Sequence, residues 1–312
     1  MEGIVIKSTG SFYTVKQDDG AIIQCKLKGK FKIEGLKATN PVVAGDRVGF
    51  KYLDDKTTGL INKIQKRKNY IIRKATNLSK LTHIVAANID NAFLIVTLAE
   101  PRTSTGFIDR FLVTAEAYSI PTHIVFNKID INDKELKNRR NELIEIYTKI
   151  GYKCYEVSAL KEINIDILKE KMKGKINLFA GHSGVGKSEL INKIEPGLSI
   201  QIGEISKVHN KGKHTTTFAE MHELSFGGYI IDTPGIKEFG LIDFYKEELF
   251  HYFPEIFRIS SECQFHNCTH EHEPNCAVIR AVEEGIISET RYKNYINILT
   301  DSDMDINEWE LR

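Results

Sequence analysis

The stretch Gly181-His182-Ser183-Gly184-Val185-Gly186-Lys187-Ser188 decides the fold of the middle of this 312-residue chain. It matches the pattern G-x-x-x-x-G-K-[ST], with an apolar run at residues 176–180 before it and a helical pattern at residues 187–194 after it. The glycines let backbone N–H groups surround phosphates, Lys187 reaches the β/γ oxygens, and the Ser188 hydroxyl binds Mg²⁺. The stretch therefore predicts a phosphate-binding loop between a strand and a helix.

The surrounding sequence alternates apolar runs with amphipathic stretches. The pattern predicts helices at residues 105–118 and 133–150. It predicts strands at residues 92–98, 122–126, 153–157, 176–180 and 228–231. Strands that alternate with helices indicate an α/β domain, with a parallel sheet covered on both faces.

The motif Asn127-Lys128-Ile129-Asp130 follows a predicted strand and indicates which base is bound. The Asp130 carboxylate can accept hydrogen bonds from guanine N1–H and N2–H₂, a donor pair that adenine lacks. Asn127 would tie this loop to the phosphate loop, and the Lys128 stem would cover the base. Ser158-Ala159-Leu160 ends another strand and offers a backbone N–H to guanine O6. Together these motifs predict a GTP-binding site.

Two further motifs indicate contacts with Mg²⁺ and the γ-phosphate. Asp232-Thr233-Pro234-Gly235 follows a predicted strand, so that Asp232 would act on the Mg²⁺ and the Gly235 N–H on the γ-phosphate. One of the three threonines at residues 215–217 would bind Mg²⁺ only when the γ-phosphate is present, which makes a switch. The pattern does not choose among the three, and we assign the role to Thr216.

The order of the motifs predicts a circular permutation. In common GTPases the phosphate loop, switch threonine and D-x-x-G come before N-K-x-D and S-A-x. Here N-K-x-D at residue 127 and S-A-L at residue 158 precede the phosphate loop at residue 181 and D-x-x-G at residue 232. The usual termini would be joined through about residues 161–175, and the last switch would lead directly into the C-terminal segment.

The N-terminal segment has a different composition from the rest. Residues 1–72 contain short runs rich in β-branched and aromatic residues, which predicts a small barrel such as an OB-fold. Residues 1–74 hold 16 Lys/Arg and 7 Asp/Glu, a net charge of +9 that makes this segment a candidate nucleic-acid surface, with a merely solvated basic surface as the competing interpretation. The sequence contains neither an apolar run of membrane length nor a visible signal peptide, so we expect a cytoplasmic protein without a membrane partner.

The C-terminal segment is acidic, helical in pattern and rich in metal-binding residue types. Cys263, Cys268 and Cys276 lie within fourteen positions, with His266, His270 and His272 as possible fourth ligands. In a reducing compartment, clustered cysteines indicate metal rather than disulfides. Three thiolates and one imidazole make a closed tetrahedral set, so we expect one structural Zn²⁺.

Together these motifs resemble the ribosome small subunit-dependent GTPase A family, also called RsgA or YjeQ. The resemblance covers essentially the whole chain and implies an OB-fold-like RNA-binding domain at residues 1–72, a circularly permuted GTPase domain at 73–240 and a helical zinc-binding domain at 241–312. The family pattern C-x₄-C-x-H-x₅-C places the fourth ligand on His270.

The resemblance also implies a function. It implies late maturation of the small (30S) ribosomal subunit, with binding of its rRNA and release after GTP hydrolysis. Hydrolysis would be slow alone and stimulated by the subunit. We expect a monomer that binds GTP and GDP with Mg²⁺.

Two other classes of function compete with this interpretation. A P-loop ATPase or small-molecule kinase would need neither N-K-x-D nor S-A-L, and both are present. A zinc-dependent RNA-binding protein whose nucleotide site only regulates binding would bind GTP without turnover. Nucleotide competition and hydrolysis assays distinguish these classes.

His214 is the predicted catalytic residue. Many GTPases place a glutamine directly after D-x-x-G to orient the attacking water, but here that position holds Ile236, which has no hydrogen-bonding group. His214 lies directly before the switch threonines, and an imidazole near neutral pKa can accept a hydrogen bond from water. A surface histidine without a catalytic part is the competing interpretation.

Overall fold

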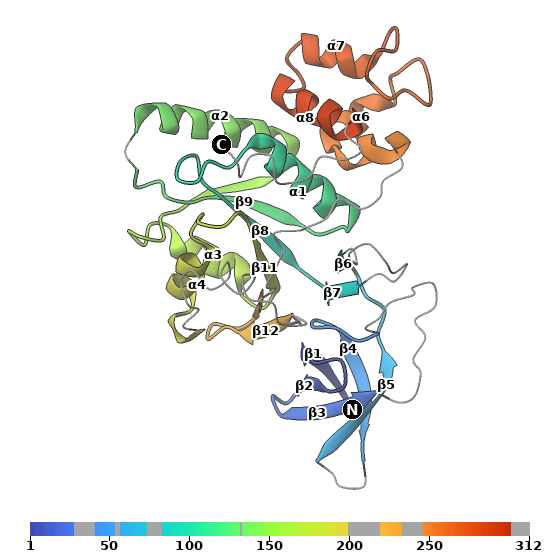
Figure 1. Ribbon diagram of the computed structural model, residues 1–312, viewed down its shortest axis with the longest axis vertical. Helices are drawn as coiled ribbons and strands as arrows, with labels where there is room; N and C mark the ends of the chain where they lie inside the picture. Colours follow the sequence, from blue (N-terminus) through green and yellow to red (C-terminus); the bar gives the residue numbers. More distant parts are fainter. Residues whose placement is uncertain are drawn as a thin grey trace, which may run out of the picture.

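The fold is described from a computed structural model that covers residues 1–27, 41–53, 57–73, 83–131, 133–198, 219–232 and 246–300. Three parts lie along its longest axis (Figure 1). A small barrel that holds the N-terminus occupies one end, a sheet with helices on both faces forms the middle, and a group of helices forms the other end.

Five short strands make the barrel. They are β1 (Glu2–Ser8), β2 (Tyr13–Gln17), β3 (Ile22–Leu27), β4 (Arg47–Tyr52) and β5 (Thr58–Ile64). Neighbouring strands pair in the closed order β1-β2-β3-β5-β4-β1, with β3 and β5 parallel and every other pair antiparallel. Alternate side chains point inward, and Val5, Val15 and Ile61 are fully buried in the core. This closed five-stranded barrel confirms the predicted OB-like shape.

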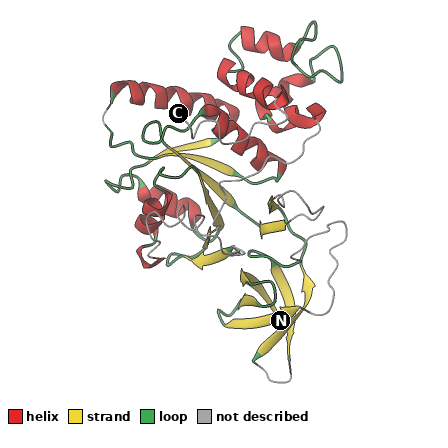
Figure 2. Ribbon diagram, viewed as in Figure 1, coloured by secondary structure: helices red, strands yellow, loops and turns green. Residues whose placement is uncertain are grey.

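The central sheet carries the α/β domain. Its order is β10 (Lys153–Glu156), β9 (Thr122–Phe126), β8 (Asn91–Val96), β11 (Ile176–Ala180), β13 (Tyr229–Asp232) and β12 (Glu220–Glu223). The first five strands are parallel and β12 is antiparallel to β13. Figure 2 shows the strands of this sheet between helices on both of its faces. Because β11 lies in the middle, the loop that follows it emerges at the centre of the carboxyl edge.

Helices cover both faces of this sheet. Helices α1 (Thr105–Ala117) and α2 (Lys134–Ile150) lie on one face, and α3 (Ile165–Met172) and α4 (Lys187–Ile194) on the other (Figure 1). Successive residues of β8 serve opposite faces, because Leu94 packs in the core under α1 and α2 while Phe93 and Ile95 pack under α3 and α4. A strand buried on both faces reads as a continuous apolar run, which explains its sequence.

The barrel and the central sheet form one continuous sheet of eleven strands. Strand β1 pairs antiparallel with β12 at Lys7 and Glu220. Ion pairs support this junction, with Lys7 Nζ 2.6 Å from Glu220 and Lys16 Nζ 2.5 Å from Glu223. A separate hairpin of β6 (Tyr70–Arg73) and β7 (His83–Ala87) connects the two parts along the chain.

The C-terminal part is helical, as predicted. It contains a 3₁₀ helix, η4 (Lys246–Tyr252), followed by α6 (Pro254–Ser260), α7 (Ala277–Glu283) and α8 (Glu289–Thr300). Its core includes Phe253, Ile256 and Tyr295, together with Val113 from α1. Among the residues that the structure describes, none of the helices combines the length and the apolar character that crossing a bilayer requires.

The predicted elements agree closely with the structure in the central domain. Strands β9 and β11 and helix α4 have the predicted bounds, and the other predicted elements there differ by one or two residues. Helix α3 lies within residues 161–175, which were expected only to connect the positions of the termini of common GTPases. Strand β12 and the β6–β7 hairpin were not predicted. The proposed domain boundaries after residues 72 and 240 stay predictions.

A buried ion pair holds the segment that leaves the barrel. Arg67 donates from Nε and Nη2 to the two oxygens of Asp46, both at 2.6 Å, and Nη2 also donates to the Pro41 carbonyl. Asp46 is fully buried and its carboxylate also accepts from the Val43 N–H at 2.9 Å. The pair therefore fixes residue 67, after β5, to the turn before β4.

Removing Arg67 should destabilise the protein. We expect Arg67→Ala to lower the free energy of unfolding by about 3 kcal/mol, because the Asp46 charge would stay buried without its partner. Urea unfolding measures this loss. The matched control is Arg139→Ala, which breaks an exposed pair with Glu142 and should cost less than about 1 kcal/mol. Equal losses in the two variants would contradict the assignment.

Candidate functional site

The phosphate loop connects β11 to α4 at the centre of the sheet. Its backbone approaches its neighbours so closely that only glycine fits at two positions. A Cβ on Gly181, whose φ is +139°, would lie 2.3 Å from the Ile95 carbonyl oxygen. A Cβ on Gly186, whose φ is +91°, would lie 2.5 Å from the side-chain nitrogen of Asn127. The loop leads directly into α4, and the free N–H groups at the N-terminus of this helix favour phosphate binding.

Lys187 and Ser188 occupy the first turn of α4. The Lys187 ammonium donates to the carbonyls of Gly181 and His182, at 2.6 and 2.5 Å, so its side chain folds back over the loop. This position puts the charge over the loop's concave backbone, as a lysine that contacts β/γ oxygens requires.

Asn127 ties three loops together. It follows β9 and is 5% exposed. Its side-chain N–H donates to the Val185 carbonyl of the phosphate loop at 2.9 Å, and its side-chain oxygen accepts from the Ala159 N–H at 3.1 Å. The predicted tie between the N-K-x-D loop and the phosphate loop is therefore present, and the same amide also holds the S-A-L loop.

The predicted guanine-binding residues lie side by side. The Ser158 hydroxyl donates to one Asp130 oxygen at 2.5 Å and accepts from the Lys161 N–H at 3.0 Å. Ser158 is fully buried and Asp130 is partly exposed, so the buried serine hydroxyl orients a carboxylate that solvent can reach. The Lys128 ammonium donates to the Glu100 carbonyl, so the aliphatic part of the Lys128 side chain extends from the N-K-x-D loop to the segment after β8. Contacts of these residues with guanine stay predictions.

Several predicted residues lie outside the described part of the chain. These are His214, the threonines at 215–217, Gly235 and Ile236. The backbone of Asp232 is described, and it ends β13, directly beside β11. This position agrees with a residue that acts near the phosphate loop.

The segment after β8 also lines the phosphate loop, and no sequence motif marked it. The Phe107 ring packs on the His182 ring with their centroids 3.6 Å apart. A Cβ on Gly184 would lie 3.2 Å from Pro101, which shows how closely the two segments pack. The available signal was positional, because loops that follow neighbouring parallel strands meet at the same edge.

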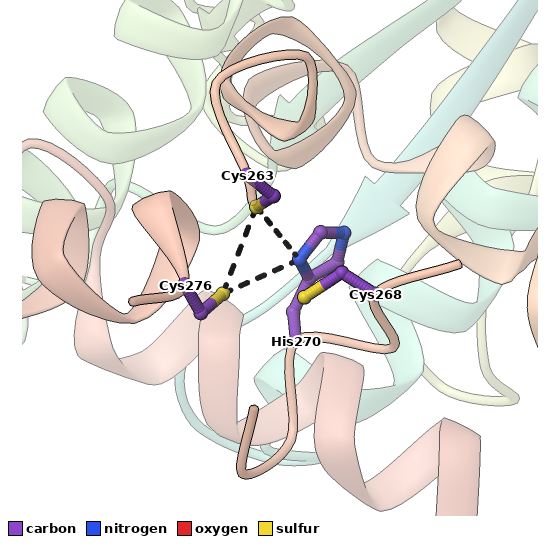
Figure 3. Close-up of side chains that lie close together, drawn as sticks. All are labelled: Cys263, Cys268, His270 and Cys276. Atoms are coloured by element: carbon purple, nitrogen blue, oxygen red, sulfur yellow. Dashed lines mark hydrogen bonds between the residues drawn. The ribbon is translucent and has the colours of Figure 1, made fainter. Parts of the chain in front are cut away.

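The four predicted metal ligands converge in the C-terminal domain. The ligand atoms of Cys263, Cys268, His270 and Cys276 all lie within 4.8 Å of one another (Figure 3). His270 Nδ1 lies 3.6 Å from the Cys263 sulfur and 3.4 Å from the Cys276 sulfur, and these sulfurs are 3.9 Å apart. A tetrahedral zinc site, with bonds of about 2.3 Å to sulfur and 2.0 Å to nitrogen, has edges of about 3.5–3.8 Å. The four donors therefore fit one tetrahedral cation.

Burial keeps the Cys268 side chain as a thiol and the His270 side chain as a neutral imidazole unless a cation binds. Burial raises the pKa of the Cys268 thiol to about 12, so its surroundings alone do not stabilise a thiolate. Burial lowers the pKa of His270, which keeps its imidazole in the neutral form that binds metals. A bound divalent cation would supply the missing stabilisation of the thiolates.

The loop that carries the ligands is held by its own hydrogen bonds. The Glu273 carboxylate accepts from the backbone N–H groups of Thr269, Glu271 and His272 and from the Thr269 hydroxyl. On α8, the Tyr292 hydroxyl donates to the His270 carbonyl at 2.8 Å. These contacts fix His270 inside the cluster, while His272 is exposed and belongs to the loop's outer side.

Comparisons with known proteins cover almost the whole chain. Residues 64–242 match the family model for the RsgA GTPase, and residues 2–61 match the model for the RsgA N-terminal domain. The small ribosomal subunit biogenesis GTPase RsgA 2 of Bacteroides thetaiotaomicron is 55% identical over 97% of each chain. The small ribosomal subunit biogenesis GTPase RsgA of Christiangramia forsetii is 52% identical over 96% of each chain.

Solved structures are similar over the same length. YjeQ from Thermotoga maritima superposes with a TM-score of 0.78 at 39% identity and covers 96% of both chains. YloQ, described as a circularly permuted GTPase, superposes with a TM-score of 0.76 at 32% identity and covers 96% of this chain and 93% of its own.

Changing Asp130 should change the preferred base. Asp130→Asn replaces an acceptor oxygen by a donor, so we expect at least a tenfold loss of GTP affinity and a gain for xanthosine nucleotides, whose C2 group is an acceptor. Competition against a fluorescent guanine nucleotide measures both. Asp133→Asn, at the N-cap of α2, is the control and should bind GTP normally. Unchanged GTP affinity in Asp130→Asn would remove Asp130 from the base site.

Changing Cys268 should remove the metal. We expect purified protein to hold one zinc per chain, and Cys268→Ala to lose most of it and to unfold at a lower temperature. Elemental analysis and thermal unfolding measure the two effects. Cys154→Ala, in β10 and outside the cluster, should keep its zinc. Full zinc occupancy in Cys268→Ala would contradict the assignment.

Proposed function

The chain belongs to the RsgA GTPase family and is a GTP hydrolase, and we propose that it acts in late maturation of the small ribosomal subunit. Family membership confirms the resemblance seen in the sequence. It also decides against an ATPase or kinase and against a nucleotide site without turnover. The proposal for the subunit is supported by relatives that are named small ribosomal subunit biogenesis GTPases and match over nearly their whole length.

We assign the nucleotide contacts from the geometry at the carboxyl edge of the sheet. The backbone of the phosphate loop and Lys187 would bind the phosphates, and Ser188 would bind Mg²⁺. Asp130, which Ser158 orients, would bind the guanine edge, and Asn127 would hold both loops in register. The bound Mg²⁺ would neutralise charge on the β- and γ-phosphates during transfer to water.

We assign the ribosomal RNA surface to the barrel. Besides its net charge, the barrel and the segment that follows β5 expose lysine side chains, at Lys26, Lys51, Lys63, Lys66 and Lys68. Lysines that contact phosphates release counterions, so binding should weaken steeply with salt. The acidic C-terminal domain is a poor match for RNA phosphates, which leaves the barrel as the favoured surface.

The metal in the cluster is proposed to be one structural Zn²⁺. Cys263, Cys268, His270 and Cys276 would fill all four positions of a tetrahedron, which leaves no position for a substrate. A bound zinc contributes folding energy, so it would hold together the loop between α6 and α7.

The protein is proposed to work as a monomer in the cytoplasm, where the small subunit is assembled, and to leave the subunit after hydrolysis. Hydrolysis is proposed to be slow in the free protein, because Ile236 cannot position a water molecule. Docking on the subunit would then supply what is missing, with His214 as the residue that orients the water.

The test is GTP hydrolysis with and without purified small ribosomal subunits. We expect stimulation by at least tenfold with small subunits and none with large subunits, and sedimentation with small subunits that high salt abolishes. Equal rates in the presence and absence of small subunits, together with no sedimentation, would overturn the proposed function.

His214→Ala should separate binding from hydrolysis. We expect nearly normal GTP affinity, loss of most of the stimulated turnover, and longer residence on the subunit with GTP. His209→Ala, five residues earlier, is the control and should keep the stimulated rate. Stimulated turnover of His214→Ala within about twofold of the wild type, less than about 0.5 kcal/mol in the barrier, would rule His214 out.

A further inference from the structure

A buried charge network joins the C-terminal domain to helix α1 of the central domain. Arg291 and Asn294, both on α8, donate to the two oxygens of Asp109 on α1, each at 2.6 Å. Arg291 also donates to both oxygens of Glu255 on α6, at 2.7 and 3.1 Å. Asp109 is 0% exposed and Arg291 is 1% exposed, so the network lies inside the protein.

This network fixes α1 against α8. Burial raises the pKa of Asp109, and hydrogen bonds from Arg291, Asn294 and the Tyr147 hydroxyl oppose that shift. The Arg291 guanidinium also lies over the Phe253 ring, 4.5 Å from its centroid. Because a buried charge that loses its partner stays uncompensated, α1 and α8 cannot slide apart without a large loss of stability.

The same helix contacts the phosphate loop two residues before Asp109. Phe107 packs on His182, which is the second residue of the loop. In an α-helix, residues 107 and 109 are about 3 Å apart along the axis. The ring that packs on the phosphate loop and the carboxylate that α8 holds therefore belong to one rigid stretch of backbone.

Helix α1 is also shared between two hydrophobic cores. Ile108 and Leu112 pack in the core of the central sheet, whereas Val113 packs with the C-terminal core. Close-packed interiors transmit a displacement instead of absorbing it. A shift of the C-terminal domain would therefore move α1, and with it the ring that packs on the phosphate loop.

We infer that the C-terminal domain controls nucleotide affinity through α1, with Asp109, Asn294 and Phe107 as positioning residues for the phosphate loop. A well-held α1 keeps His182 and the loop in the arrangement that nucleotide phosphates need. When α1 is loosened, part of the binding free energy is used to order the loop. Coupling between two sites is reciprocal, so nucleotide binding also stabilises the C-terminal domain.

The first test loosens the network without breaking it. Arg291→Ala would strand two buried carboxylates and could unfold the domain, so Asn294→Ala is used, which leaves Asp109 with Arg291 and Tyr147. We expect its dissociation constant for GDP to rise about fivefold, the lower end of usual coupling between sites. Asn138→Ala, an exposed asparagine on α2, is the matched control and should bind GDP normally.

The second test asks whether both residues act through one route. Phe107→Leu should also weaken GDP binding, and Asn294→Ala added to it should change the affinity by less than twofold further. Phe107→Tyr keeps the ring and should restore both the affinity and the sensitivity to Asn294→Ala. Phe257→Leu, an exposed phenylalanine of α6, controls for a general effect of the substitution. The inference would be overturned if the losses of GDP affinity in Phe107→Leu and Asn294→Ala multiplied in the double variant. It would also be overturned if Asn294→Ala alone changed the GDP affinity by less than twofold.

The reciprocal effect gives a readout that a merely structural role does not move. In the full-length wild type, saturating GDP should slow hydrogen exchange of the α8 amides at least threefold. In Phe107→Leu, also saturated with GDP, that protection should be lost while α8 stays folded. Identical α8 exchange with and without GDP in the wild type would contradict the coupling.

Discussion

The amide of Asn127 is the interaction on which the nucleotide site depends. It joins the phosphate loop, which lies 58 residues further along the chain, to the S-A-L loop 32 residues away. An amide carries both a donor and an acceptor, so one side chain holds two loops at once. Gly186 leaves the space for this amide, and a Cβ there would displace it. The geometry of the nucleotide site therefore depends on how these loops are positioned relative to one another.

The circular permutation leaves that register intact. Parallel strands place their carboxyl ends at one edge of the sheet whatever their order in the chain, so β9, β11 and β13 still deliver their loops to the same place. What changes is the connection. The strand that ends with Asp232 is followed in the chain by the C-terminal segment, whose helices pack on Val113 of α1.

The sequence predicted the parts of the fold that follow from local patterns. Strand β11 and helix α4 are fixed by one apolar run and one glycine-rich loop, and both bounds were predicted correctly. The cluster around Cys268 was predicted because metal ligands have characteristic spacing. Strand β12 was missed because residues 220–223 (Glu-Met-His-Glu) are mostly polar, and such a sequence does not indicate a strand by itself. The pairing of these residues with β13 and β1 decides their structure. Likewise, Asp109 and Arg291 are 182 residues apart, and neither belongs to a recognisable motif. Only the packing of α8 on α1 reveals that both are buried.

The position of the barrel has a consequence for solubility. Strand β12 is the last strand on its side of the central sheet, and an exposed edge of this kind is a template for pairing with other chains. Strand β1 lies on that edge, and Lys7 of β1 and Lys16 of β2 pair with Glu220 and Glu223, so the barrel partly covers it. A chain that lacks the barrel would expose β12 as a free edge. The barrel therefore covers part of an edge that, when open, favours aggregation.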